Sequence, residues 1–172
     1  TLRRRFTGHS DWVWSVHAAQ VDGAPCAASG SEDGTVRLWR SDTGDLVREY
    51  AGHSGKVLVV RLSADGSLLA SAGTDSAIHV ERTGRGRGAR TMSWQTPAII
   101  ALSFSPDGDH LAAGSQDGTI QLRRTSDGVV VRSFRAHSGQ VRSVEFSADG
   151  SLLVSSGSDH VATIWRVRPR LG

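Results

Sequence analysis

The fold of this chain is decided by a short segment, Cys26 to Arg40, which reads CAASGSEDGTVRLWR. A run of small and apolar residues leads into an Asp-Gly turn, and a second apolar run follows it. Asp-Gly between two apolar runs is the strongest short-range signal for a β-hairpin. Related segments begin at Leu69 (LASAGTDSAIHVER), Leu111 (LAAGSQDGTIQLRR) and Leu153 (LVSSGSDHVATIWR). The sequence therefore predicts the same hairpin four times.

The four hairpins recur at a fixed period. Their turn aspartates, Asp33, Asp75, Asp117 and Asp159, are 42 residues apart at each step, a period typical of repeat architectures. A second turn precedes each hairpin, and no segment has the period of an amphipathic helix. We predict an all-β chain with four short strands in each repeat. The expected strands of the second repeat cover 57–62, 68–73, 77–81 and 90–93, and the clearest fourth strands elsewhere cover 46–50 and 129–134.

Composition narrows the class of protein. The chain has 172 residues, of which 20 are glycine and only Cys26 is cysteine, so an internal disulfide framework is excluded. No apolar run approaches the ~18 residues that a membrane helix needs, and the N-terminus lacks the pattern of a signal peptide. We expect a soluble, cytoplasmic protein that has no membrane partner.

The basic residues do not favour nucleic acid as a partner. Arginine clusters occur at Arg3 to Arg5 and at Arg82, Arg85, Arg87 and Arg90, but the formal net charge is only +3. A stripe able to neutralise a phosphate backbone is not evident. Weak nucleic-acid binding through these clusters remains an alternative, and a steep dependence of binding on salt would support it.

Paired motifs identify a family. Gly8-His9 and Gly52-His53, together with Trp39 and Trp165 at the ends of strands, resemble the WD-repeat family of β-propellers over nearly the whole chain. The resemblance implies a ring of four-stranded blades around a central channel. It divides a single domain, 1–172, into blade units at about 7–50, 51–93, 94–134 and 135–168.

The resemblance also assigns a hydrogen-bonded tetrad to each repeat. The first and last repeats are complete, with His9, Ser29, Asp33 and Trp39 and with His137, Ser155, Asp159 and Trp165. The second keeps His53, Ser71 and Asp75 but has Glu81 in place of tryptophan, and the third keeps only Asp117, with Gln95, Ala113 and Arg123 at the other positions. Because its tetrad is incomplete, His53 is expected to be more solvated than His9 or His137.

Serine, histidine and aspartate are also the members of a hydrolase triad. The set nevertheless recurs in register with the repeat, and no glycine-framed nucleophile elbow surrounds the serines. We therefore interpret it as structural, expect no catalytic residue and predict that the protein is not an enzyme. The seven histidines show no paired His-x-x-x-His spacing, so we expect no metal site and no cofactor.

In this family a partner usually binds at the rim of the channel. The residues at the start of each first strand and in the turn before each third strand should line one mouth of the ring, and we call them the mouth residues. They are Trp12, Trp14, Glu32, Lys56, Leu58, Thr74, Trp94, Ala98, Ile100, Gln116, Gln140, Arg142 and Ser158. Alternation along a strand places Trp12 and Trp14 on one face and Val13 on the other. We predict a scaffold that binds a protein or peptide there; packing of the tryptophans between blades is the alternative.

Four blades are few for this family. Residues 2–6 resemble the fourth strands and are expected to complete a final blade, either within the chain or in a second copy. We prefer a homodimer that closes an eight-bladed ring, because an open sheet edge is an aggregation hazard. The alternative is an engineered or partial propeller that folds and oligomerises without a further function.

Overall fold

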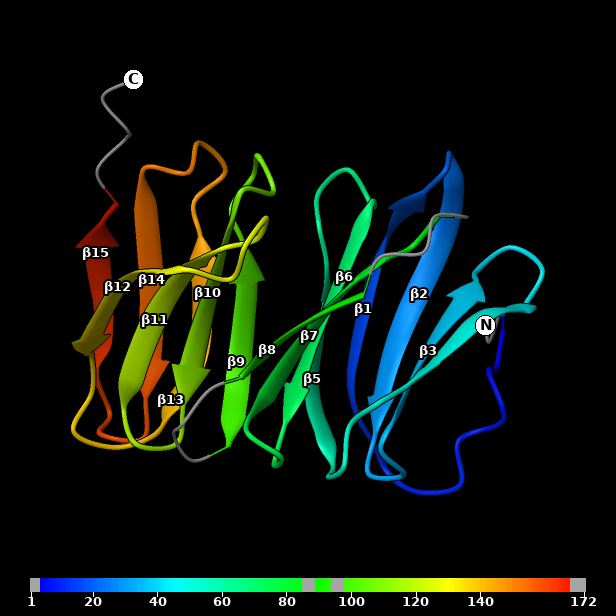
Figure 1. The fold of residues 1–172 in the computed structure, drawn as a ribbon, viewed down its shortest axis with the longest axis horizontal. Coiled ribbons are helices and arrows are strands. Elements are labelled where there is room, and N and C mark those ends of the chain that lie inside the picture. The colour runs from blue at the N-terminus through cyan, green and yellow to red at the C-terminus, as the bar shows by residue number, and fades with distance from the viewer. Residues whose placement is uncertain (1–3, 85–88, 94–97, 168–172) are drawn as a thin grey trace. The chain divides into compact units, whose positions relative to one another are not determined.

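The computed structural model describes residues 4–84, 89–93 and 98–167. In these residues fifteen strands form four antiparallel sheets, and the strands of each sheet lie in chain order (Figure 1). Each sheet corresponds to one repeat, so the prediction of an all-β chain with four repeated sheets is confirmed. No helix that is long and apolar enough to cross a membrane occurs in the described parts.

The contacts divide the chain into two compact units, and the first covers Thr1–Trp94. Its β5 packs against β1 and β2. Val57 lies so close to Gly30 that a Cβ on the glycine would stand 2.6 Å from the valine Cγ1. The first sheet contains β1 (Val13–Val21), β2 (Ala24–Ser31), β3 (Thr35–Arg40) and β4 (Leu46–Ala51), and the second contains β5 (Val57–Leu62), β6 (Leu68–Gly73), β7 (Ala77–Arg82) and β8 (Ala89–Ser93).

The second unit, Gln95–Gly172, repeats this packing. Its β13 packs against β9 and β10, and Val141 meets Gly114 as Val57 meets Gly30. Its last sheet has three strands in the described part of the chain. The strands are β9 (Ile99–Phe104), β10 (His110–Ser115), β11 (Thr119–Arg124) and β12 (Val130–Arg135), followed by β13 (Val141–Phe146), β14 (Leu152–Gly157) and β15 (Ala162–Arg166).

Each repeat aspartate caps the hairpin turn that follows it. Asp33 accepts the backbone N–H of Thr35 at 2.9 Å, and Asp117 accepts that of Thr119 at 2.9 Å. The residue after the aspartate takes a left-handed conformation, which glycine adopts most readily. Ser76 and His160 stand there in the second and fourth repeats, with φ of 60° and 66°. The turn is therefore built the same way where the Asp-Gly signal is missing.

The expected strands of the second repeat agree with β5 to β8 to within one residue. The expected strand at 2–6 falls partly outside the described residues, and residues 4–9 are not in a strand. Phe6 nevertheless stacks on Trp39, with ring centroids 5.5 Å apart, as Phe134 of β12 contacts Trp165 at 4.7 Å. The segment before the first repeat thus contacts β3 in the way that a fourth strand contacts the following sheet.

Candidate functional site

The complete tetrads form continuous hydrogen-bond networks. In the first repeat, His9 Nδ1 lies 2.9 Å from Asp33 Oδ2, and His9 Nε2 lies 2.8 Å from Ser29 Oγ. The indole N–H of Trp39 donates to Ser29 Oγ at 2.9 Å. With the ring proton on Nδ1, each donor meets one acceptor, so the network satisfies every polar group that it buries.

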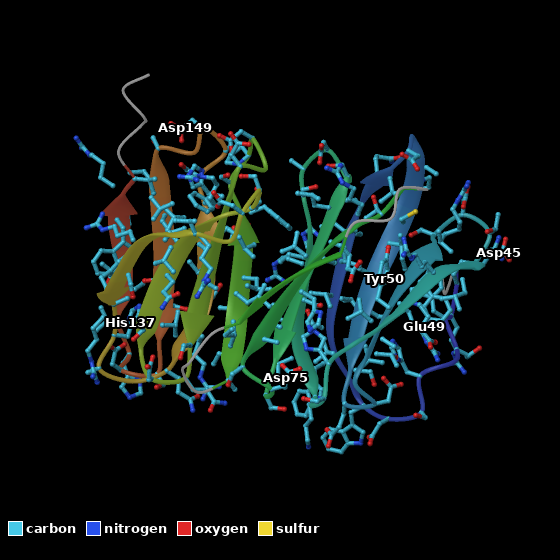
Figure 2. The ribbon with its side chains drawn as sticks, in the orientation of Figure 1. Asp45, Glu49, Tyr50, Asp75, His137 and Asp149 are labelled. Carbon is cyan, nitrogen blue, oxygen red and sulfur yellow. The ribbon has the colours of Figure 1, made fainter. Side chains whose placement is uncertain are left out.

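The fourth repeat has the same geometry. His137 Nδ1 lies 3.0 Å from Asp159 Oδ1, its Nε2 lies 2.8 Å from Ser155 Oγ, and the Trp165 indole donates to that oxygen at 2.8 Å. The His137 side chain is completely buried. In Figure 2 the label of His137 marks the segment that precedes β13. The tetrads that the family resemblance implies are therefore formed in the first and last repeats.

The second repeat corrects one expectation. His53 keeps its contacts with Asp75 and Ser71, both at 2.9 Å. Its side chain is 3% exposed, compared with 7% for His9 and 0% for His137, so the prediction that His53 is the more solvated was wrong for His9 and agrees for His137. The ring of His79 packs against His53 with centroids 4.2 Å apart and shields it.

In the third repeat, different hydrogen bonds stand in place of the tetrad network. Asp117 accepts the hydroxyl of Ser115 at 2.9 Å. Arg123, at the tryptophan position, is buried, and its guanidinium donates to Gln121 Oε1 and to the carbonyl oxygen of Gly128. Burial lowers the pKa of this guanidinium. Gln95 lies outside the described residues.

The serines of the tetrads are poorly placed for nucleophilic attack. Ser29, Ser71 and Ser155 are all buried. In the two complete tetrads the serine oxygen also accepts an indole N–H. A hydrolytic nucleophile must reach its substrate, whereas these hydroxyls are enclosed by the sheets that hold them.

We expect stability to fall in acid because of the four repeat aspartates. Burial opposes ionisation of Asp33, Asp75, Asp117 and Asp159, but their hydrogen bonds outweigh it and hold each pKa below the ordinary 3.8. A depressed pKa in the folded state stabilises the protein above the unfolded-state value, and this stabilisation is lost as pH falls through the folded-state pKa. The melting temperature should drop by roughly 5 °C or more between pH 5 and pH 3.

Calorimetry or circular dichroism against pH measures this change. Asp117→Asn is the matched variant, because Asp117 has no tetrad histidine and its amide analogue keeps the turn. The variant should show a shallower dependence on pH. A melting temperature that is constant from pH 5 to pH 3 would contradict the assignment.

A β-bulge shapes the mouth residues. In each first strand the register skips one position, between Val13 and Ser15 in β1 and between Val57 and Val59 in β5. The same irregularity occurs in β9 and β13. The skipped residues are Trp14, Leu58, Ile100 and Arg142, all of which are mouth residues. The regular pairing with the second strand is therefore interrupted at each of these four positions.

The first unit brings five mouth residues together. The rings of Trp12 and Trp14 lie 5.7 Å apart, and the two side chains are 70% and 47% exposed. The Trp14 indole N–H donates to Glu32 Oε2 at 3.0 Å, and the other oxygen of Glu32 pairs with Lys56 Nζ. Thr74 Oγ1 accepts the backbone N–H of Lys56 at 3.0 Å. We call Trp12, Trp14, Glu32, Lys56 and Thr74 the tryptophan face.

The ion pair with Lys56 stabilises the ionised carboxylate of Glu32 in the tryptophan face. The Lys56 ammonium and the Trp14 indole N–H lower the pKa of Glu32. Leu58 of the same unit is half-buried.

The mouth residues of the second unit have the same backbone geometry and a different surface. The backbone N–H of Gln116 donates to the carbonyl of Ala98, and that of Ser158 donates to the carbonyl of Gln140. Ala98 is buried, Ile100 and Gln140 are half-buried, and Gln116, Arg142 and Ser158 are exposed. Trp94 lies outside the described residues.

The comparison with known families agrees with this geometry. The sequence matches the family described as WD domain, G-beta repeat, over residues 1–40, 44–80, 89–123 and 128–166. The chain belongs to the WD-repeat family. The last three matches each cover the fourth strand of one sheet and the first three strands of the next, and the resemblance drawn from the sequence is confirmed.

Curated WD-repeat relatives match over short segments. The chain is 41% identical over 66 residues to the small ribosomal subunit protein RACK1y of Oryza sativa subsp. japonica. These 66 residues are 38% of this chain and 20% of that protein. It is 47% identical over 55 residues to a probable E3 ubiquitin ligase complex SCF subunit sconB of Arthroderma benhamiae. These 55 residues are 31% of this chain and 8% of that protein. The matched segments thus span a fifth or less of these relatives.

Two solved structures of designed proteins have a similar fold. The computationally designed Ika4 protein aligns with a TM-score of 0.80 at 24% identity and covers 95% of this chain and 96% of its own. The computationally designed Ika8 protein aligns with the same TM-score at 25% identity, over 94% of this chain and 48% of its own. The fold of this WD-repeat chain therefore occurs in solved chains of similar length and of about twice that length.

Proposed function

We propose that this WD-repeat chain is a non-enzymatic scaffold that binds a protein or peptide partner on the tryptophan face. Two relatives are named as parts of larger assemblies, a ribosomal subunit and an SCF complex. The observation that carries the proposal is the exposure of Trp12 and Trp14, which contact one another at the surface. The buried serines of the tetrads support a role other than catalysis.

The chemistry of this face suits an interface. Tryptophan is enriched among the residues that dominate binding energies, since it buries a large area at a small cost in side-chain entropy. Glu32 orients the Trp14 indole and is itself held by Lys56. An ordered pair of indoles beside one ion pair favours a partner that offers an apolar side chain flanked by polar groups.

We expect the double substitution Trp12→Ala and Trp14→Ala to abolish most binding without unfolding the chain. Both residues are exposed, so truncation should cost little stability, whereas loss of two interface tryptophans weakens a complex by about 2 kcal/mol or more. A peptide array that identifies a ligand, followed by titration calorimetry, would show a loss in affinity of at least about 30-fold.

The matched control is Leu46→Ala with Val47→Ala. These two exposed apolar residues lie on β4, at the opposite edge of the same sheet. The control should bind the peptide as the parent chain does. Equal binding by the tryptophan variant would reject this face, and failure of that variant to fold would show that the tryptophans belong to the core.

We also propose that two copies of the chain close an eight-bladed ring. The supporting observation is an apolar face that is buried in three repeats and exposed in the fourth. Val154 and Ile164 are 39% and 67% exposed, whereas Ala28 and Leu38, their equivalents in the first repeat, are completely buried. The equivalent residues of the second and third repeats, Ala70, Val80, Ala112 and Leu122, are buried as well.

A complementary face lies on β1. Val13 and Val16 are exposed, while their equivalents Val57 and Val60 in β5 are buried. Strand β15 is also the last of a three-stranded sheet in the described part of the chain. In the proposed dimer, the apolar face of the fourth repeat packs on β1 of the other copy, and residues 2–6 of that copy complete its sheet.

Two further expectations remain proposals. A cytoplasmic location is in keeping with the single thiol of Cys26, which is buried and whose pKa is raised by that burial. We do not propose nucleic acid as the partner, because Arg4 of the first arginine cluster already donates to the carbonyl oxygen of Asp42 within the chain. Several arginines of the two clusters lie outside the described residues.

A further inference from the structure

The second repeat contains a small cavity where the first and fourth repeats hold their tetrad tryptophans. The cavity measures about 10 Å³, which is close to the space that one water molecule needs. Polar groups of His53, Ser71, His79 and Glu81 line it, together with Tyr50 from the preceding sheet. All of these residues belong to the first unit. With Glu81 in place of tryptophan, a polar chamber lies between the first and second sheets.

Two of the residues that line the chamber, His53 and His79, belong to a cluster of metal-ligating residues. One ligand atom from each of His53, Asp75 and His79 lies within 4.8 Å of the others. The three residues come from separate segments: the turn before β5, the turn between β6 and β7, and β7 itself. Figure 2 shows Asp75 at the end of the sheet where β6 turns into β7. Spacing rules based on neighbouring histidines could not detect this site.

One of the residues that line the chamber, Tyr50, has a buried polar group without a partner. The hydroxyl of Tyr50 is buried and has no hydrogen-bond partner among the residues that the structure describes. A buried polar group that lacks a partner destabilises the folded state, so native proteins rarely keep one without a ligand or water beside it. Tyr50 and Glu81 both line this chamber together with His53 and His79.

Binding of a metal ion would require small movements of the ligands, with His53 and Asp75 moving slightly apart and His79 moving closer. A tetrahedral zinc ion with bonds of 2.0–2.2 Å holds its ligands about 3.3 Å apart. His53 Nδ1 and Asp75 Oδ2 already lie 2.9 Å apart. A metal ion would replace the proton between them and draw in His79, whose ring already packs on His53. The fourth position would be left for water or Glu81.

The other repeats lack this combination. Arg37, Gln121 and Thr163 occupy the position of His79, and Trp39, Arg123 and Trp165 occupy that of Glu81. Arg37 brings a positive charge, and the two tryptophans fill the space of the chamber. Only the second repeat has a histidine and a glutamate at these two positions.

We propose that the second repeat binds one divalent transition-metal ion of the zinc class through His53, Asp75 and His79. Two imidazoles and a carboxylate are typical ligands of such ions. Binding would exchange the structural His53–Asp75 hydrogen bond for coordination and fasten β7 to the turn before β5.

Titration of the tag-free, metal-stripped chain with ZnCl2 tests the proposal by calorimetry. We expect one zinc ion per chain and a rise in melting temperature, and with Co²⁺ we expect the visible absorption of a tetrahedral site. Affinity should fall between pH 7 and pH 5.5, because the ligating imidazoles must be deprotonated. A chain that takes up no stoichiometric zinc would overturn the proposal.

His79→Gln is the decisive variant, because Gln121 occupies the same position in the third repeat and the substitution therefore suits the sheet. It should weaken zinc binding at least about tenfold. His110→Gln, at the start of β10 in the other unit, is the control and should bind zinc as the parent does. Equal affinity in His79→Gln and the parent, or an equal loss in both variants, would reject the site.

Discussion

Replacement of Ile164 by aspartate is expected to convert the two-chain ring into monomers. The mass from light scattering should fall from about twice 18.3 kDa to that of one chain. Ile164 is 67% exposed on β15, although the equivalent Leu38 is completely buried. The substitution places a carboxylate at the centre of the surface that the proposed dimer buries.

The expected effect is large because a closed two-chain ring contains this interface twice. Full burial of an isoleucine side chain contributes about 1.5–3 kcal/mol, and burial of an unpaired carboxylate costs more than that gain. Two such losses raise the dissociation constant of the dimer at least about 100-fold. The folded monomer should persist, since the substituted side chain is largely exposed within one chain.

Val130→Asp is the matched control for this experiment. Val130 is an exposed apolar residue on β12 of the same unit, and no part of the proposed interface includes it. This variant should remain dimeric. A parent chain that is already monomeric, or an Ile164→Asp variant that stays dimeric, would reject the ring and leave the tryptophan face as a separate proposal.

The sequence predicts the fold well because the fold is a repeat. Four aspartates at a fixed spacing place the turns, and the apolar runs between them place the strands to within a residue in the second repeat. The turns at Ser76 and His160 keep their shape without glycine, because the aspartate cap and the sheet on either side determine the conformation. In a repeat protein, a repeat with clear sequence signals therefore indicates the structure of the repeats whose signals are weaker.

The candidate sites were less predictable. Alternation along β1 does not predict the bulge at Trp14, since a bulge depends on pairing with β2. The expectation that His53 is more exposed than His9 was also wrong. A missing tryptophan suggests an opening, but His79, on the same strand as Glu81, packs against His53. Contacts between residues that are distant in the sequence decide both outcomes.

Replacement of His137 by alanine is expected to lower the free energy of unfolding by about 3 kcal/mol. The imidazole is completely buried and connects Asp159 to Ser155. Its removal leaves a cavity and deprives both groups of a hydrogen-bond partner in a dry environment. Gly157 also lies against this ring, where a Cβ would stand 2.5 Å from the histidine Cγ, so the backbone has been shaped around it.

Urea unfolding of the parent chain and of His137→Ala measures this loss. The control is His110→Ala, at a half-buried position, which should lower the free energy of unfolding by less than about 1 kcal/mol.

A double-mutant cycle between His137 and Trp165 should give a coupling energy of about 0.5–3 kcal/mol, because both side chains bond the oxygen of Ser155. A structural network predicts this coupling together with the loss of stability. A catalytic triad instead predicts a variant that keeps its stability and loses a hydrolytic activity, and that result would contradict the structural assignment.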